Sequence, residues 1–547
     1  MSIILVSCNL EVSMKNRPYP LYSLPEATDL RDIVRRRAEE APGAIAFSFM
    51  TRKEKILRKS CKEFLDDVNA FGTYLWNKGY KDCHIGIVGR NSYEYLVAFI
   101  AISCGGNVAV PIDKHLSADR IAQLLRQAAC KAVFVSRRCT PLLSEIEELP
   151  QFHTYELTDY IAEGRQLLEE GCTDYIDYEI DVKKTAAIFF TSGTTGDSKG
   201  VMLSQENMAF DINAACKNVT LTGSTLAVLP FHHTFGLVTA IFMIYHYGHP
   251  IHINYSLKYL QEDLKNIKPQ LMCVVPLFVE TFYKSIMSTA RKTGKDKLLK
   301  RMSKVTDVML NVGIDTRSAV YKTVLNAFGG NLNCLVCGGA ALDPRLVQAL
   351  RTFGINVLNG YGITECSPVV SVNRNNYWRD GSVGQILEGI DVRITIDDEI
   401  LVKGGNVMQG YYKDEAATQL VLNDGWYSTG DLGRIDDDGF LFITGRKKNL
   451  IILSNGENVS PEEIEAQILR DENVAEAVVY ENKGALAIQI FPVEEYIGNN
   501  EYFEELIKEF NKTQPQYKHI RKVTLRDEEF EKNSTKKILR FKITDPA

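Results

Sequence analysis

The sequence has no large excess of one charge and no uninterrupted apolar segment long enough to cross a membrane. Lysine and arginine together number 63 and aspartate and glutamate 69, which gives a formal net charge of -6 from interspersed charges. No chain-wide basic field therefore points to nucleic acid as a partner. The longest apolar segment, residues 96–112, is interrupted by Gly105, Gly106 and Asn107, which predicts a helix followed by a strand.

The sequence also lacks a dense cysteine framework, and we expect its first residues to be a poor leader. The 12 cysteines are scattered through apolar stretches, so we expect reduced thiols and no structural disulfide. Cys334 and Cys337 form a C-x-x-C motif without a second pair, and their apolar surroundings predict a core strand. Residues 1–14 have no basic leader before a long apolar core and make a poor signal peptide, with Met14 as an alternative start. We expect a cytoplasmic protein.

Three histidines recur at every third position without suggesting a metal site. His246, His249 and His252 have the spacing of one helix face, yet Gly248 and Pro250 break any helix there. In a strand, residues i and i+3 point to opposite faces. No metal role is therefore expected for these histidines.

Length and patterning predict more than one domain of α/β class. At 547 residues with 45% apolar content, the chain exceeds one compact core. Up to about residue 375, helical patterns alternate with short apolar strands, and residues 381–444 then show short alternating segments with turns, as in a β-rich subdomain. A small α+β domain follows, with a helix starting at Ser460. The predicted domains are residues 1–447 and 448–547. Strands are predicted at residues 84–88, 132–135, 226–229, 272–275 and 334–336.

Residues 190–204, FTSGTTGDSKGVMLS, form the most informative segment. The apolar run 185–190 predicts a buried strand before this loop, and Ser204 is an N-cap for a helix after it, so the predicted context is strand, loop, helix. Glycines let the backbone approach anionic oxygens, hydroxyls donate hydrogen bonds, and Lys199 supplies positive charge. The residues concerned are Thr191, Ser192, Gly193, Thr194, Thr195, Gly196 and Gly200.

This loop predicts a nucleotide phosphate site of an uncommon kind. It does not match the P-loop of kinases and GTPases, which has four residues between its glycines and then Lys-Ser or Lys-Thr. A different nucleotide-binding family is implied. The alternative is a flexible polar loop at a sheet edge.

Seven further segments follow the loop in a fixed order. They are 231–236 (FHHTFG), 337–340 (CGGA), 359–365 (NGYGITE), 428–431 (STGD), 445–448 (GRKK), 455–458 (NGEN) and 533–540 (NSTKKILR). With the loop, they resemble the AMP-forming adenylating enzymes: acyl-CoA synthetases, free-standing adenylation domains and firefly luciferase. The resemblance spans nearly the whole chain. It implies a large N-terminal domain of stacked α/β layers and a small, mobile C-terminal domain.

The resemblance also implies a two-step reaction that needs ATP, Mg²⁺ and a thiol. A carboxylate attacks the α-phosphate of ATP, pyrophosphate leaves, and a thiol then converts the acyl-adenylate into a thioester. The family pattern places the β- and γ-phosphates at residues 191–199 and the α-phosphate at Thr364. It gives Glu365 the role of Mg²⁺ ligand, and a carboxylate suits that hard cation. A solvated loop charge is the alternative for Glu365.

The remaining nucleotide contacts are implied in the same way. The adenine is expected between the CGGA segment and the ring of Tyr361, and the ribose hydroxyls at Asp431, seconded by Arg446. Core packing is the alternative for Tyr361 and a turn role for Asp431. The adenine-side residues are Gly338, Gly339, Ala340, Asn359, Gly360, Tyr361 and Gly362.

Two residues are implied to act on the acid itself. His233 aligns with the histidine or aromatic residue of the acyl site, with a buried core histidine as the alternative and no role for His232. Lys537 aligns with the catalytic lysine, which balances charge between the carboxylate and the α-phosphate. Lys536 stands where the family usually has glycine, so a register that makes Lys536 catalytic stays open. Ser198 stands where the family usually has proline.

The C-terminal domain is implied to rotate between the two steps. Lys448 falls on the hinge position, where one residue absorbs a large backbone change. Gly456 has no side chain, so the pantetheine arm of the thiol substrate can pass close to it.

The kind of acid is inferred from sequence motifs, and the acceptor from the domains that the chain contains. No carrier domain is fused to the chain, so we expect CoA as the acceptor. Residues 295–351 and the motif TECSP at 364–368 resemble fatty-acyl-CoA synthetases more than aryl-CoA ligases, which favours a medium- or long-chain acid. The basic run 295–301 is a solvated helix face, or at most a peripheral contact with anionic lipid.

Two other functions remain open from the sequence. One is a free-standing enzyme that loads the phosphopantetheine of an acyl carrier protein. The other is a degenerate nucleotide binder without catalysis, motivated by the departures at Ser198 and Lys536.

Overall fold

The computed structural model describes most of the chain, and the described residues form two compact units. Described are residues 20–50, 55–146, 148–191, 198–294, 296–311, 314–453, 457–482, 484–532 and 538–543. The larger unit comprises the described residues of 20–391 and 402–427, and the smaller one those of 392–401 and 428–543. Each unit is described by itself below.

A nine-stranded sheet runs through the larger unit in the order β15-β14-β13-β12-β11-β9-β10-β1-β2. Its central strands are parallel and buried, as expected for apolar runs covered by helices on both faces. The predicted strands at residues 226–229, 272–275 and 334–336 are confirmed as β9, β11 and β12. The strands are β1 (Ile45–Met50), β2 (Ile56–Ser60), β9 (Thr225–Ala227), β10 (Ile251–Ile253), β11 (Leu271–Val274), β12 (Cys334–Cys337), β13 (Asn356–Gly362), β14 (Val369–Val372) and β15 (Gln385–Ile386).

A seven-stranded sheet in the same unit has the order β18-β8-β7-β4-β3-β5-β6. Strand β3 has the predicted bounds, and residues 96–112 form the end of α3 followed by β4, as predicted from the glycines between them. The strands are β3 (His84–Val88), β4 (Val108–Ile112), β5 (Cys130–Val135), β6 (Gln151–His153), β7 (Thr185–Thr191), β8 (Lys199–Ser204) and β18 (Gly410–Tyr411).

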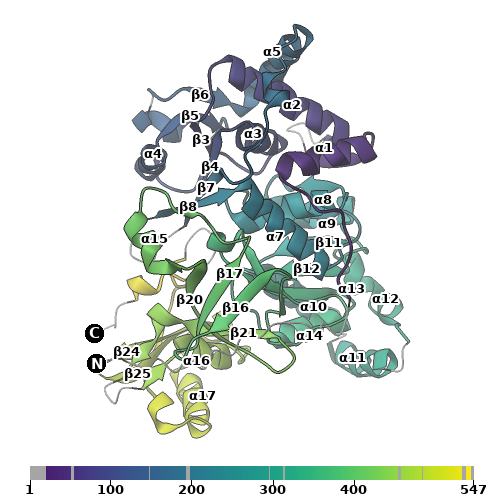
Figure 1. The fold of residues 1–547 in the computed structure, drawn as a ribbon. Coiled ribbons are helices and arrows are strands. Elements are labelled where there is room, and N and C mark those ends of the chain that lie inside the picture. Colours follow the sequence, from purple (N-terminus) through teal and green to yellow (C-terminus); the bar gives the residue numbers. More distant parts are fainter. Residues whose placement is uncertain are drawn as a thin grey trace, which may run out of the picture. The chain divides into compact units, whose positions relative to one another are not determined.

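Helices cover both sheets of the larger unit. Helix α2 packs on α3 and on α5 (Figure 1), and Phe99 of α3 contacts Phe189 of β7 and Phe242, so α3 is buried around its circumference. The longer helices are α1 (Leu30–Glu40), α2 (Cys61–Asn77), α3 (Tyr93–Ser103), α4 (Ala118–Gln127), α5 (Leu157–Glu169), α7 (Gln205–Asn218), α9 (Leu260–Ile267), α10 (Pro276–Lys292), α11 (Asp296–Asn311) and α14 (Pro344–Thr352).

The predicted context of the glycine-rich loop is wrong in one respect. The loop connects two antiparallel strands, β7 and β8, and the helix α7 begins only after β8. Residues 199–204 pair with β7, from Lys199 opposite Thr191 to Ser204 opposite Thr185, so this short segment is a strand and α7 begins only at Gln205. Ser204 is the N-cap, as predicted, and forms a capping box with Asn207.

The smaller unit contains the predicted α+β pattern near the C-terminus. Strands β24 (Val474–Asn482), β25 (Ala485–Pro492) and β26 (Ile520–Leu525) form one sheet, and helices α16 (Pro461–Ile468) and α17 (Asn500–Lys512) contribute apolar side chains to its core. Helix α16 starts after Ser460, as predicted, although the Ser460 hydroxyl donates to the carbonyl of Thr444 at 2.8 Å and does not cap the helix.

Residues predicted to be β-rich form a further sheet, in the order β16-β17-β20-β19 with β21 beside β20. Its strands are β16 (Ile390–Ile394), β17 (Glu399–Gly404), β19 (Leu422–Asn423), β20 (Trp426–Ile435) and β21 (Leu441–Arg446). By packing, residues 392–401 and 428–446 group with the C-terminal residues.

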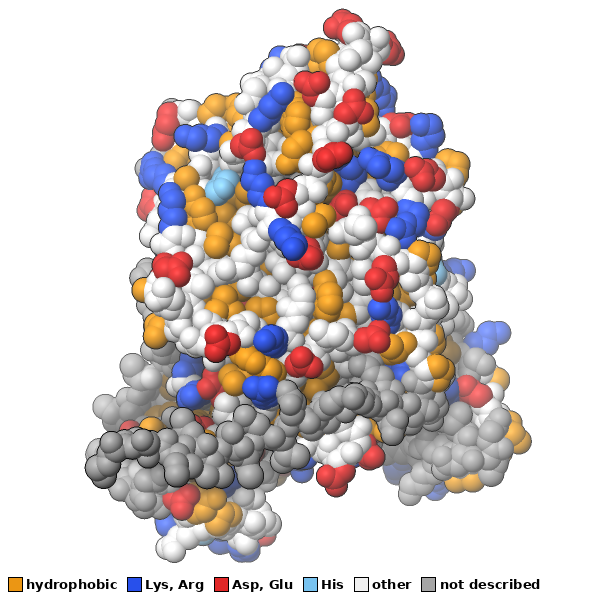
Figure 2. All heavy atoms as spheres, in the orientation of Figure 1, with side chains coloured by type: hydrophobic (Ala, Val, Ile, Leu, Met, Phe, Trp, Pro, Cys, Tyr) orange, Lys and Arg blue, Asp and Glu red, His pale blue; other side chains and the backbone are white. Residues whose placement is uncertain are grey.

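The surface agrees with the balanced composition. On the face shown in Figure 2, positive and negative side chains are interspersed. Within the described ranges, none of the helices is both long and apolar enough to span a membrane. Of the three spaced histidines, His246 ends a short helix, His249 contacts the carbonyl of Leu221 and His252 lies in β10.

Candidate active site

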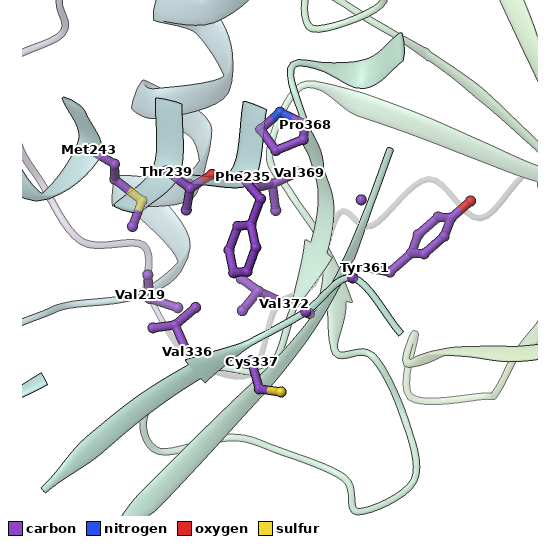
Figure 3. A pocket seen from close by; sticks show the side chains of 15 residues that line it. Val219, Phe235, Thr239, Met243, Val336, Cys337, Tyr361, Pro368, Val369 and Val372 are labelled. Carbon is purple, nitrogen blue, oxygen red and sulfur yellow. The ribbon is translucent and has the colours of Figure 1, made fainter. Parts of the chain in front are cut away.

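An apolar pocket lies inside the larger unit, between α7, the helix η3 (Phe235–Met243) and strands β12, β13 and β14 (Figure 3). Its solvent-accessible volume is about 70 Å³. Met243 and Val219 lie at one end, and Tyr361 lies at the opposite end with its ring pointing away from the pocket (Figure 3). The lining residues are Ala215, Val219, Phe235, Thr239, Met243, Val336, Cys337, Gly338, Gly339, Gly360, Tyr361, Gly362, Pro368, Val369 and Val372.

Two glycine segments predicted to bind adenine form one wall of this pocket. A Cβ atom at Gly338 would lie 3.5 Å from the carbonyl oxygen of Gly360, so the two segments run side by side. Gly339 has a φ of +88°, which favours glycine, and a Cβ atom at Gly362 would lie 2.3 Å from the carbonyl oxygen of Pro368. The pocket is therefore bordered here by bare backbone.

The other adenine-side residues surround this wall. Asn359 is buried on β13, and its side-chain amide donates to the carbonyl of Ser382 at 3.0 Å. Ala340 is exposed just beyond β12. The structure thus gathers the residues predicted at the adenine near the carboxyl ends of the neighbouring parallel strands β12 and β13.

The helix η3 that faces the glycine wall is a π-helix. Its hydrogen bonds span five residues instead of four, a form that is rare and frequent at functional sites. It supplies Phe235, Thr239 and Met243 to the pocket. The sequence FHHTFG leads directly into it, and a Cβ atom at Gly236 would lie 2.0 Å from the carbonyl oxygen of Pro230. Glycine at this position therefore permits the tight entry into η3.

Beside His233 lies His232, which the sequence analysis left without a role and which has a carboxylate, Asp113, close by. The rings of His232 and His233 lie 4.2 Å apart, and His232 Nε2 lies 3.6 Å from Asp113 Oδ2. Burial, followed by the charge of His233, lowers the pKa of His232 to about 3, so His232 is neutral. Asp113 directly follows β4, which is parallel to β7 in the sheet. Because the carboxyl ends of parallel strands meet at one edge of a sheet, Asp113 lies at the same edge as Thr191 at the end of β7.

Glu365 and Lys199 share one contact residue, Tyr411. The Tyr411 hydroxyl donates to Glu365 Oε1 at 2.9 Å, and Lys199 Nζ lies 4.7 Å from the centre of the Tyr411 ring. Glu365 follows Thr364 in a short 3₁₀ turn, η5 (Thr364–Cys366). The sequence analysis did not single out Tyr411, because nothing in its local sequence distinguishes it from Tyr412.

The surroundings of Glu365 suit Mg²⁺. Its carboxylate is half-buried, and among the described residues its second oxygen, Oε2, has no hydrogen-bond partner. In that same part of the chain, no group of three His, Cys, Asp or Glu side chains could hold a metal ion. Mg²⁺ is typically held by one or two carboxylates together with substrate phosphates and water, so a lone carboxylate fits this ion.

Both ends of the glycine-rich loop are fixed by the seven-stranded sheet. Thr191 ends β7 and Lys199 begins β8. Ser198, where the family usually has proline, accepts a hydrogen bond from Arg120 Nη2 at 2.9 Å, and its carbonyl accepts one from Gln127 at 3.2 Å. Helix α4 therefore anchors the end of the loop next to Lys199.

Asp431 and Arg446 are neighbours in the smaller unit. They pair in register across β20 and β21, and Arg446 Nε donates to Asp431 Oδ1 at 2.5 Å. Asp431 is buried, and its backbone N–H donates to the Thr429 hydroxyl at 3.0 Å. Lys448 is exposed in a 3₁₀ turn, η6 (Lys447–Asn449).

Part of the predicted site lies outside the described residues. These positions are Ser192, Gly193, Thr194, Thr195, Gly196, Gly456, Lys536 and Lys537.

Family models match most of the chain. One, described as AMP-binding enzyme, matches residues 34–412, and one described as AMP-binding enzyme C-terminal domain matches residues 448–545. The chain belongs to the family of AMP-binding enzymes. The resemblance found in the sequence is therefore confirmed, and the family's AMP-forming acyl-CoA ligases are this enzyme's curated relatives.

Two of these relatives show the extent of the match. Long-chain-fatty-acid–CoA ligase FadD15 of Mycobacterium bovis is 30% identical over 451 residues, covering 77% of this chain and 74% of the relative. Human long-chain-fatty-acid–CoA ligase 1 is 29% identical over 472 residues, covering 77% and 67%.

Solved structures show the same fold at lower identity. The o-succinylbenzoate CoA synthetase MenE of Bacillus subtilis, in complex with its acyl-adenylate intermediate, aligns with a TM-score of 0.75 at 22% identity, covering 96% of this chain and 99% of MenE. A fatty acyl CoA synthetase of Mycobacterium tuberculosis aligns with a TM-score of 0.67 at 20% identity, covering 94% and 97%. The predicted α/β class, with a large N-terminal and a smaller C-terminal domain, is confirmed by these alignments.

Proposed function

We propose that this AMP-binding enzyme activates a medium- or long-chain fatty acid with ATP and transfers the acyl group to CoA. The observation that carries the proposal is the apolar pocket, because one of its walls consists of the glycine segments predicted to bind adenylate. An acid whose hydrocarbon chain fills this pocket has its carboxylate beside the nucleotide. The names of the curated relatives, long-chain-fatty-acid–CoA ligases, support a fatty acid as the substrate. The scattered, reduced cysteines support a cytoplasmic location.

In the first step, the acid carboxylate attacks the α-phosphorus of ATP and the bond to pyrophosphate breaks. Lys199 and the loop that precedes it bind the β- and γ-phosphates, and Thr364 contacts the α-phosphate. Glu365 holds Mg²⁺, which neutralises charge on the polyphosphate when it is bound. Lys537 stabilises the negative charge that builds up between carboxylate and α-phosphate.

Other residues orient the two substrates. The Tyr361 ring points away from the acyl pocket (Figure 3), and we expect it to stack on adenine, while Asp431 and Arg446 bind the ribose hydroxyls. His233 lies at the start of η3, where it orients the carboxylate or shields it from water. In the second step, the CoA thiolate attacks the acyl carbonyl and AMP leaves.

We further propose that the two steps use two orientations of the C-terminal domain. The hinge is Lys448, between residues 1–447 and 448–547. One orientation presents Lys537 for adenylation, and the other presents the segment around Gly456 to the pantetheine arm of CoA.

A panel of acids tests the proposal. Pyrophosphate release is measured with saturated fatty acids and aryl acids, each with CoA, with holo acyl carrier protein, and without a thiol. We expect fatty acids to give release that CoA accelerates. Acceleration by the carrier protein alone would identify a carrier-loading enzyme, and no acid-dependent release would identify a nucleotide binder without catalysis.

The lysine assignment is tested by separating the two steps. We expect Lys537→Ala to abolish acyl-adenylate formation, which is measured by pyrophosphate exchange. Attack of CoA on acyl-adenylate that is supplied to the enzyme should stay largely intact. Lys536→Ala is the matched control. If Lys536→Ala abolishes exchange instead, the catalytic register is one residue earlier, and equal loss of both steps in Lys537→Ala would contradict the assignment.

A further inference from the structure

We propose that Tyr411 is a positioning residue that sets the metal-binding carboxylate of Glu365 and the phosphate-binding ammonium of Lys199 relative to each other. This inference rests on the proposed function, since it takes the roles of Glu365 and Lys199 from there. Tyr411 itself contacts neither the acid nor the reacting phosphorus in this assignment.

The backbone around Tyr411 is tied to both partners. Strand β18 pairs antiparallel with β8, with Tyr411 opposite Val201, two residues after Lys199. On the other side, the backbone N–H of Met408 donates to the carbonyl of Glu365 at 2.8 Å. The segment that carries Tyr411 is therefore held between the strand of Lys199 and the turn of Glu365.

The Tyr411 hydroxyl fixes one oxygen of the carboxylate. Tyr411 is 6% exposed, and its hydroxyl donates to Glu365 Oε1 while it receives a hydrogen bond from the buried hydroxyl of Tyr427. A carboxylate held by one oxygen presents the other in a defined direction. Hydrogen-bond partners of this kind orient metal ligands and tune metal affinity.

The Tyr411 ring holds the lysine without neutralising it. Lys199 lies over the ring, and within the described part of the chain it forms no ion pair. A carboxylate partner would compete with phosphate for the ammonium, whereas an aromatic face attracts the cation weakly and leaves its charge available. One side chain thus serves both groups, the hydroxyl for Glu365 and the ring for Lys199.

The test compares ATP affinity with and without the metal. Isothermal titration calorimetry gives the dissociation constant of ATP in excess Mg²⁺ and in EDTA. Tyr411→Phe keeps the ring and removes the hydroxyl, so we expect it to weaken binding about 10- to 100-fold in Mg²⁺, as loss of an outer-shell partner does, and to change binding little in EDTA. Tyr411→Leu removes the ring as well and should weaken binding in both conditions.

Tyr412→Phe is the matched control. Tyr412 is the next residue, and within the described ranges its hydroxyl forms no hydrogen bond, although its ring contacts His84 at 5.1 Å. We expect unchanged affinity in both conditions. A folding defect lowers the number of binding sites in the titration and leaves the ratio of the two dissociation constants unchanged, so this ratio reports positioning.

Two results would overturn the inference. In the first, Tyr411→Phe has the same ratio of dissociation constants as the unmodified enzyme, while Glu365→Gln loses the effect of Mg²⁺ on ATP binding. The metal role of Glu365 then stands, and the positioning role of Tyr411 fails. The other is Glu365→Gln with an unchanged Mg²⁺ effect, which removes the proposed metal role itself and with it the basis of the inference.

Discussion

Shortening Met243 should let the enzyme accept longer acids. Met243 is buried at the end of the pocket opposite Tyr361, and Met243→Ala removes everything beyond Cβ (Figure 3). The vacated length accommodates about two methylenes of substrate. Burial of one methylene contributes about 0.8 kcal/mol, so two contribute about 1.6 kcal/mol, or about 14-fold in kcat/KM. We expect the preferred chain to lengthen by about two carbons.

The assay is kcat/KM from pyrophosphate release over saturated acids of increasing length. Met272→Ala is the matched control, because Met272 is buried in the core around β11 and does not line the pocket. Both variants should lose stability, typically about 2–5 kcal/mol for such a truncation, but only Met243→Ala should shift the length profile. An unchanged optimum in Met243→Ala, or an equal shift in Met272→Ala, would refute the placement of the acyl chain.

Three further predictions concern the adenylate wall, the ribose site and acid stability. Gly362→Ala should lower adenylation about 100-fold by displacing β13 from Pro368, while Gly43→Ala, whose Cβ meets no atom within 4 Å, should leave it unchanged. Asp431→Asn should raise the KM for ATP about 10- to 100-fold without raising that for the acid, the effect of losing a charged hydrogen-bond acceptor. Burial lowers the pKa of His246 and His252 to about 4. Because these histidines take up protons more readily in the unfolded chain, their contribution to the free energy of unfolding is full above about pH 6.5 and is lost as the pH falls toward 4. The urea midpoint should fall over that range, and less in the His246→Gln/His252→Gln double variant; an equal fall would argue against these histidines.

Much of the fold could be predicted where local pattern and environment agree. Residues 84–88 are a continuous apolar run and form β3 with those bounds, and the glycines after residue 103 separate α3 from β4. Strand β8 was missed because it is short and because its last residue, Ser204, is also a strong N-cap for α7. The N-cap was read correctly, but the strand before it depends on pairing with β7, which local sequence does not encode.

The candidate site shows the same division. The glycine segments at 338–339 and 360–362 could be found from their sequence motifs, and the structure places them side by side. Tyr411 and Asp113 could not be found in this way. Each reaches the site through the order of strands in the seven-stranded sheet, where residues distant in sequence become neighbours.

The loosely wound coil of η3 makes the floor of the pocket sensitive to insertions and deletions. Each hydrogen-bonded turn of this helix holds one residue more than an α-helical turn, and Phe235, Thr239 and Met243 line the cavity in that winding. Loss of a single residue would let the coil relax to the commoner form and rotate its later side chains around the helix axis relative to the pocket. In this chain, a change of length in one helix is thus a route by which evolution can reshape acid preference without replacing any lining residue.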